Sequence, residues 1–208
     1  MTKPPIKCEF ISWRRIEHLI AGLAHKIRAA NFYPDCIVAI ARGGWVPARL
    51  LCDHLDVYQL NSLRIIHYTS GTQITKQAQL LAPLNIDVHG QNVLLVDDVS
   101  DTGDTLALAR EHVQGFHPKA VKIAVIHHKQ TSTFIPDFYA QKVVRWRWIG
   151  YPWARVEDLC EFVEALQPNL KTAEAMAYGL QQAYRIKVPE DILVEVINVL
   201  EKRAAEKS

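Results

Sequence analysis

Two adjacent carboxylates, Asp97 and Asp98, follow an apolar run at 93–96 and precede a compact Asp-Thr-Gly-Asp-Thr turn at 101–105. The apolar run is typical of a strand buried on both faces of a parallel sheet, and the run after the turn, at 106–109, indicates a helix. A strand, a small-residue turn and a helix bring backbone N–H groups and the positive end of the helix dipole to one point, which suits phosphate. We therefore predict a site for a phosphorylated sugar, with carboxylates that hold Mg²⁺ or a sugar hydroxyl.

A second Gly-rich turn, Arg42-Gly43-Gly44, follows the candidate buried strand 36–41 and precedes a helical run at 48–55. Glycine lets the backbone approach an anion closely, and arginine adds a charge with bidentate geometry. By themselves both motifs have ordinary explanations. Glycines after a strand are commonly plain turns, and an Asp pair is commonly a polar loop that caps a helix.

The remaining chain supplies the elements that must position these residues. An amphipathic helix follows Ser12, and further strands are predicted at 63–68, 121–126 and 143–149, with residues 1–8 as a loose leader. Three helices follow, from 155 to a stop at Pro168, at 171–184 and at 190–203. The repeated strand–helix order predicts an α/β domain with a mostly parallel sheet flanked by helices. We expect one domain at 1–166 and a C-terminal helical extension at 167–208.

Composition limits the kinds of partner. The formal net charge is only +2, so nucleic acid is not expected as a partner, and no apolar run approaches membrane-spanning length. The four cysteines are scattered without a Cys-x-x-Cys pair, which favours a reduced, cytoplasmic setting. The Arg/Trp alternation at 145–148 allows stacking on nucleic acid, packing of indoles at a sheet edge, or an aromatic face against a planar base.

The stretch 92–105 resembles the phosphoribosyl-pyrophosphate (PRPP) motif of type I phosphoribosyltransferases, in which an apolar strand, two acidic residues and two spacers precede Asp-Thr-Gly-x-Thr. The resemblance implies the Rossmann-like fold of that family. It also implies that Arg42, Gly43 and Gly44 bind the diphosphate, with a cis peptide at Ala41–Arg42. The polar stretch 69–78 would be a mobile hood that closes over the active site, where Lys76 within it and Tyr68 just before it could contact phosphate.

The downstream layout is closest to that of xanthine-guanine phosphoribosyltransferases. Lys129 ends a predicted strand, and Trp148-Ile149-Gly150-Tyr151-Pro152-Trp153 matches the Trp-Ile-x-x-Pro-Trp segment of those enzymes. The resemblance implies that Lys129 contacts the 6-oxo group of a purine, that Trp148 stacks on the base, and that the backbone around Ile149 reaches its 2-substituent.

The implied reaction is purine salvage: transfer of the 5-phosphoribosyl group from PRPP to xanthine, guanine or hypoxanthine, with release of diphosphate and formation of the nucleotide. Asp97 and Asp98 would hold the ribose hydroxyls and Mg²⁺, directly or through water, and Asp101 matches the general base. The whole ribose-phosphate set is Asp97, Asp98, Ser100, Asp101, Thr102, Gly103, Asp104 and Thr105. Asp104 is unexpected because it places an anion beside a phosphate site.

Two alternatives remain open. A regulator with this fold could sense PRPP or a nucleotide, and an enzyme with this fold could use another acceptor. The enzyme is favoured because Asp101, Lys129 and Trp148 are all present. A lysine donor suits a 6-oxo group and would match the amino group of adenine poorly. We also expect a homodimer or a higher homo-oligomer.

Overall fold

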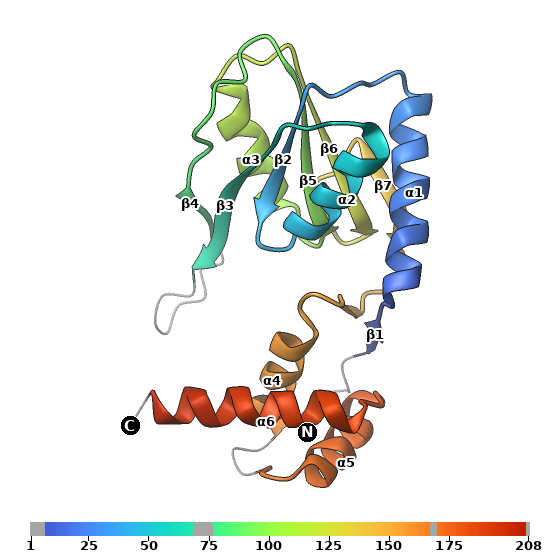
Figure 1. The fold of residues 1–208 in the computed structure, drawn as a ribbon, viewed down its shortest axis with the longest axis vertical. Helices are drawn as coiled ribbons and strands as arrows, with labels where there is room; N and C mark the ends of the chain where they lie inside the picture. Colours follow the sequence, from blue (N-terminus) through green and yellow to red (C-terminus); the bar gives the residue numbers. More distant parts are fainter. Residues whose placement is uncertain (1–6, 69–76, 167–169, 207–208) are drawn as a thin grey trace. The chain divides into compact units, whose positions relative to one another are not determined.

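The computed structural model describes residues 7–68, 77–166 and 170–206. Its elements are β1 (Cys8–Phe10), α1 (Trp13–Ala29), β2 (Cys36–Ala41), α2 (Trp45–Leu55), β3 (Leu60–Tyr68), β4 (Gln77–Ala82), β5 (Asn92–Ser100), α3 (Asp104–Gln114), β6 (Ala120–Lys129), β7 (Phe138–Val143), β8 (Trp148–Gly150), α4 (Arg155–Leu166), α5 (Ala173–Tyr184) and α6 (Glu190–Ala205) (Figure 1). The chain divides into two compact units, one at 14–146 and the other made of 1–13 with 147–208.

The unit at 14–146 contains a six-stranded sheet in the order β4-β3-β2-β5-β6-β7 (Figure 1). Every neighbouring pair is parallel except β3 and β4, which pair antiparallel. Parallel strands need crossover connections, and α2 and α3 supply two of them. The predicted α/β fold with a mostly parallel sheet is therefore confirmed.

β2 is apolar along its whole length, and β5 is apolar from Val93 to Val96, because both faces of the sheet are covered there. On one face, Val38 and Ile40 of β2 and Leu95 of β5 pack in a cluster with Leu106 and Val113 of α3. The intervening residues of β2 and β5 are buried too, and α2 packs against both strands. In α1 the predicted apolar stripe is buried, namely Ile16, Leu19, Ile20, Leu23 and Ile27.

The sequence prediction of one strand over 143–149 was wrong, because its middle, residues 144–147, lies in no strand. Val143 ends β7, which the sequence analysis missed, and residues 144–147 belong to no strand or helix. Trp148 begins β8, which pairs in parallel with β1 in a separate two-stranded sheet. The alternation of Arg and Trp resembles a strand pattern, but here the chain passes from one sheet to another. Cys8–Phe10, within and just after the predicted leader, forms β1, a strand too short to detect locally.

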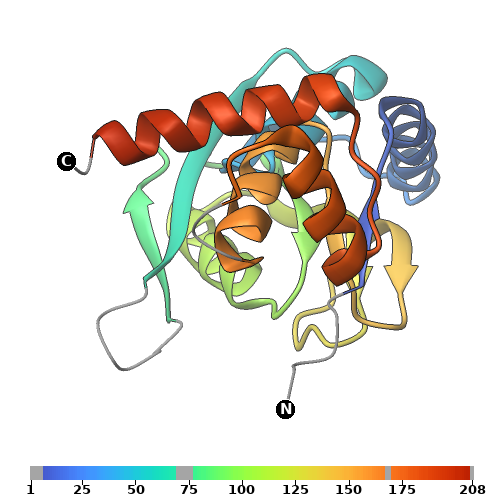
Figure 2. The ribbon, with the colours of Figure 1, turned by 90° about the horizontal axis from the view of Figure 1, so that it is seen from below.

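The second unit has its own core, made by α4, α5 and α6, which pack against one another pairwise (Figure 2). Leu159, Phe162, Met176, Leu180 and Val196 are buried in it. The three predicted helices are confirmed, and Thr172 caps α5 by accepting the N–H of Ala175 at 3.2 Å. In this core α4, which we assigned to the first domain, packs with α5 and α6 of the predicted extension. The predicted division into domains 1–166 and 167–208 stays a prediction. No helix in the described part of the chain has the length and apolarity of a membrane span.

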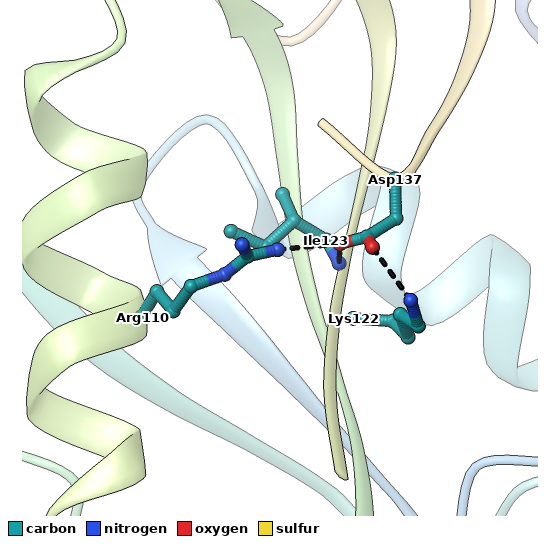
Figure 3. A network of polar contacts seen from close by, with 4 residues as sticks. All are labelled: Arg110, Lys122, Ile123 and Asp137. Atoms are coloured by element: carbon teal, nitrogen blue, oxygen red, sulfur yellow. Dashed lines mark hydrogen bonds and ion pairs between the residues drawn. The ribbon is translucent and has the colours of Figure 1, made fainter. Parts of the chain in front are cut away.

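A polar cluster ties α3 to β6 and to the segment that leads into β7 (Figure 3). Asp137 accepts hydrogen bonds from Arg110, from Lys122 Nζ at 2.8 Å and from the backbone N–H of Ile123 at 2.9 Å. The side chain of Asp137 is 19% exposed, and charge-assisted bonds of this kind are stronger than neutral ones. The carboxylate therefore holds the start of β7 against the sheet.

Replacing Asp137 by Ala is expected to lower the free energy of unfolding by about 2–3 kcal/mol, because the Ile123 N–H and two cations lose their acceptor together. The two cations are partly exposed, and solvent screening limits the loss. Urea unfolding measures this difference. The exposed Asp53 is the control, and its replacement by Ala should cost less than about 0.5 kcal/mol. Equal losses for the two variants would contradict the role of Asp137.

Candidate active site

The carboxyl ends of β2 and β5 lie side by side in the sheet, with Ala39 paired to Val96. The connection after β2 leads through α2 to β3, whereas the connection after β5 leads through α3 to β6 on the opposite side. Loops diverge at such a switch point, and open α/β sheets bind ligands there. The Gly-rich loop, residues 42–44, and the acidic segment, residues 97–101, are thus brought to one edge of the sheet (Figure 1).

The Gly-rich loop has the backbone form expected of it. The Ala41–Arg42 peptide is cis, as the resemblance implied. The N–H of Gly44 donates to the carbonyl of Ile40 at 2.9 Å, and Gly44 is the N-cap of α2. A Cβ on Gly43 would lie 2.7 Å from Cγ of Asp98 and 2.8 Å from its Oδ1. Glycine at this position therefore lets the loop approach the acidic pair, which joins the two predicted motifs into one site.

The acidic pair lies inside β5, which continues to Ser100 rather than ending at Val96. Asp97 is buried, and its Oδ1 accepts the backbone N–H of Asp98 at 2.9 Å. Burial raises the pKa of Asp97 well above its ordinary value; the neighbouring Asp98 carboxylate raises it further, and the hydrogen bond opposes both. Asp98 is partly exposed and faces Gly43, so it is the more accessible carboxylate of the pair.

The turn at 101–105 leads into α3 with Gly103 as the N-cap, at a φ of 102°. Polar side chains in this turn and just before it form hydrogen bonds within the protein. The hydroxyl of Ser100 is buried and lies 2.7 Å from that of Ser132, so it is directed into the fold rather than toward a phosphate. Asp104 is exposed and accepts the Thr102 hydroxyl at 3.0 Å. This contact accounts for an acidic residue at that position.

The loop at 131–134, which the sequence analysis missed, packs against this turn and holds it in place. The N–H and hydroxyl of Thr133 donate to the carbonyl of Thr102 at 2.9 and 3.0 Å, and the hydroxyl of Thr131 donates to the carbonyl of Asp101. A Cβ on Gly103 would collide with the backbone of Phe134. Polar residues after a strand give no local signal of such packing.

Asp101 and Lys129, predicted as general base and base-binding residue, form an ion pair of 2.6 Å between Oδ2 and Nζ. A third residue, Trp146, completes the group: its Nε1–H donates to Oδ1 of Asp101 at 3.2 Å, and its ring centroid lies 4.7 Å from Lys129 Nζ. The side chain of Lys129 is only 4% exposed, whereas that of Asp101 is 45% exposed. Trp146 was not among the predicted site residues.

The other two predicted base-binding residues belong to the second unit. The ring of Trp148 meets that of Phe162 edge to face, 5.7 Å between centroids, and packs against the core of the C-terminal helices. Ile149 is buried and pairs with Glu9 of β1. Of the predicted hood, residues 69–76, including Lys76, lie outside the described residues, and so does the side chain of Tyr68.

Comparison with known families matches residues 9–155 to the phosphoribosyl transferase domain. The chain belongs to the phosphoribosyltransferase family. The match covers the switch point, both predicted loops and the Lys129 strand, and the expected enzyme class, a phosphoribosyltransferase, is confirmed.

Individual members of the family extend this result. The chain is 31% identical, over 74% of its length and 91% of the relative's, to a xanthine-guanine phosphoribosyltransferase of Chromohalobacter salexigens. A purine phosphoribosyltransferase from Pyrococcus horikoshii has a similar structure, with a TM-score of 0.63, 32% identity and coverage of 71% of this chain and 94% of that one. A hypothetical protein from Neisseria gonorrhoeae with bound ppGpp matches with a TM-score of 0.64 and 29% identity over 71% of this chain and 89% of that one.

Proposed function

We propose that this chain transfers the 5-phosphoribosyl group of PRPP to a ring nitrogen of a 6-oxopurine and releases diphosphate. The contact of Gly43 with Asp98 carries the proposal, because it brings a backbone anion loop and a ribose-binding carboxylate to the same switch point. The xanthine-guanine and purine enzymes among the relatives support the choice of acceptor.

PRPP would bind across the two loops. Arg42 and the backbone of Gly43 and Gly44 would hold its diphosphate, and the N-terminal end of α3 would hold its 5-phosphate through backbone N–H groups of residues 102–105. Thr102, Gly103 and Thr105 remain in the proposed phosphate set. We assign Ser100 a supporting role instead, since its hydroxyl is bonded to Ser132.

The acidic pair fits Mg²⁺ as a cofactor. Carboxylate oxygens are the donors that Mg²⁺ prefers. Burial, and after it repulsion from Asp98, raise the pKa of Asp97, and a nearby cation would oppose this rise. Asp98 would hold the ion together with the ribose hydroxyls, and the buried Asp97 would act through water. The ion would supply charge neutralisation of the departing diphosphate.

The transition state for transfer resembles an oxocarbenium ion, so the chain's task is to position two reactants and to move one proton. Asp101 is half-exposed at the end of the acidic segment and would accept the proton of the purine N7. Lys129 would donate to the 6-oxo group. Trp148 and the backbone of Ile149 would complete base recognition, as the resemblance implies.

A panel of bases tests this proposal. With PRPP and Mg²⁺, release of diphosphate is expected with xanthine, guanine or hypoxanthine and not with adenine, because an ammonium donor cannot pair with an amino group. Turnover of adenine or of a pyrimidine in preference to every oxopurine would contradict the assigned role of Lys129.

A second candidate function is that of a nucleotide-responsive regulator, which the ppGpp bound to the Neisseria gonorrhoeae relative favours. ppGpp binding without turnover of any base would select it over the enzyme. We further propose that the protein works in the cytoplasm as a homodimer or higher homo-oligomer. Its four free cysteines are consistent with a reducing compartment.

A further inference from the structure

Lys129 cannot reach a ligand in the arrangement that the structure shows. Its ammonium group is paired with Oδ2 of Asp101 and lies under the ring of Trp146, and its side chain is 4% exposed. A base that receives a hydrogen bond from Nζ must take the place of at least one of these neighbours. The proposed function therefore requires a rearrangement around Lys129.

The contacts of Trp146 correspond to those assigned to the purine. Its Nε1–H donates to Asp101 Oδ1, as the N7–H of a purine would, and its π face lies against the ammonium that would otherwise meet the 6-oxo group. Both contacts, a ring N–H that donates to Asp101 and a planar ring next to Lys129, belong to partners that the proposed function assigns to the base. In this structure an indole of the chain itself makes them.

Trp146 is also placed to move. It belongs to the segment 144–147, which is in no helix or strand, and the residue is 43% exposed. By contrast, Lys129 ends β6 and Asp101 follows β5, so their backbones are held by the sheet. Of the three, Trp146 is the one carried by a segment outside every helix and strand.

We propose that Trp146 is a displaceable cap, which occupies the contacts of the purine on Asp101 and Lys129 until the base replaces it. This proposal rests on the proposed function, because it takes those two residues as the base-binding pair. Its consequence is that Trp146 competes with the base. Removing the indole should therefore improve base binding. If Trp146 only supported the structure of the site, its removal would weaken base binding instead.

The test compares wild type with Trp146→Ala, Trp146→Phe and, as control, Trp13→Ala, which removes another half-exposed indole. Trp146→Ala should lower KM for the base about fivefold, the factor of one net hydrogen bond, with kcat little changed. Trp146→Phe keeps a ring over Lys129 without the N–H and should give an intermediate KM. Trp13→Ala should leave KM unchanged.

A second readout needs no catalysis. Acetic anhydride labelling followed by peptide mass spectrometry should modify Lys129 several times faster in Trp146→Ala than in wild type, because the cap is gone. Thermal melts confirm that the variants fold. A raised KM for the base, or unchanged labelling of Lys129, in the folded Trp146→Ala variant would contradict the cap. In that case normal turnover by wild type would still support the proposed function. If wild type turns over no purine, the proposed function fails and the inference with it.

Discussion

Asp101→Ala is expected to lower kcat by about 10²–10⁴-fold, the usual contribution of a positioned general base, while the Kd of PRPP stays nearly the same. The carboxylate pairs with Lys129 and with Trp146, both assigned to the base side of the site, and is not part of the contact between Gly43 and Asp98. Single-turnover kinetics and PRPP calorimetry measure the two quantities.

Two further variants make this result specific. Asp101→Asn keeps an oxygen for Lys129 but cannot accept a proton, so it should lose kcat nearly as strongly as Asp101→Ala. Asp104→Asn changes an exposed carboxylate three residues away and should keep most of the activity. A large rise in the PRPP Kd of Asp101→Asn, with kcat preserved, would assign Asp101 to the phosphate site instead.

Gly43→Ala is expected to abolish PRPP binding at micromolar to millimolar concentrations while the protein remains folded. The new Cβ would lie against the carboxylate of Asp98, and the side chain that yields is the one that faces the ligand. Gly43→Ala should therefore reduce PRPP binding more than it reduces the stability of the fold. Calorimetric titration with PRPP and Mg²⁺ measures it.

Gly44→Ala is the informative partner of that variant. A Cβ there would collide with the backbone carbonyls of Val96 and Ile40, neither of which can rotate away. The expected result is a loss of stability of about 1–3 kcal/mol, the range typical of overpacking, together with loss of binding.

If Gly43→Ala bound PRPP as tightly as wild type, the loop and the acidic pair would not form one site.

The central sheet was predictable because its signals are local. Strands such as 36–41, buried on both faces, are continuous apolar runs, and the loops at their carboxyl ends carry the glycines and carboxylates. The resemblance added what no residue pattern contains, namely the cis peptide at Ala41–Arg42 and the pairing of the two loops as one site.

The parts that were missed depend on contacts between distant residues. The strand Cys8–Phe10 exists because it pairs with Trp148–Gly150, about 140 residues away along the chain. Trp146 enters the site through a hydrogen bond to Asp101 and a ring contact with Lys129, and Ser132 enters it through a hydrogen bond to Ser100. All of these partners are distant in the sequence, and neither residue type indicates them locally. The predicted strand at 143–149 was wrong for the same reason, because its two ends belong to different sheets and the residues between them to neither.

Phosphorus NMR of one sample containing the protein, Mg²⁺, PRPP and an equimolar mixture of xanthine, guanine and hypoxanthine tests the central claim most directly. The account predicts that PRPP disappears as diphosphate and a purine nucleoside 5′-phosphate appear in equal amounts. Formation of ribose 5-phosphate with diphosphate, or an unchanged PRPP spectrum, would contradict it.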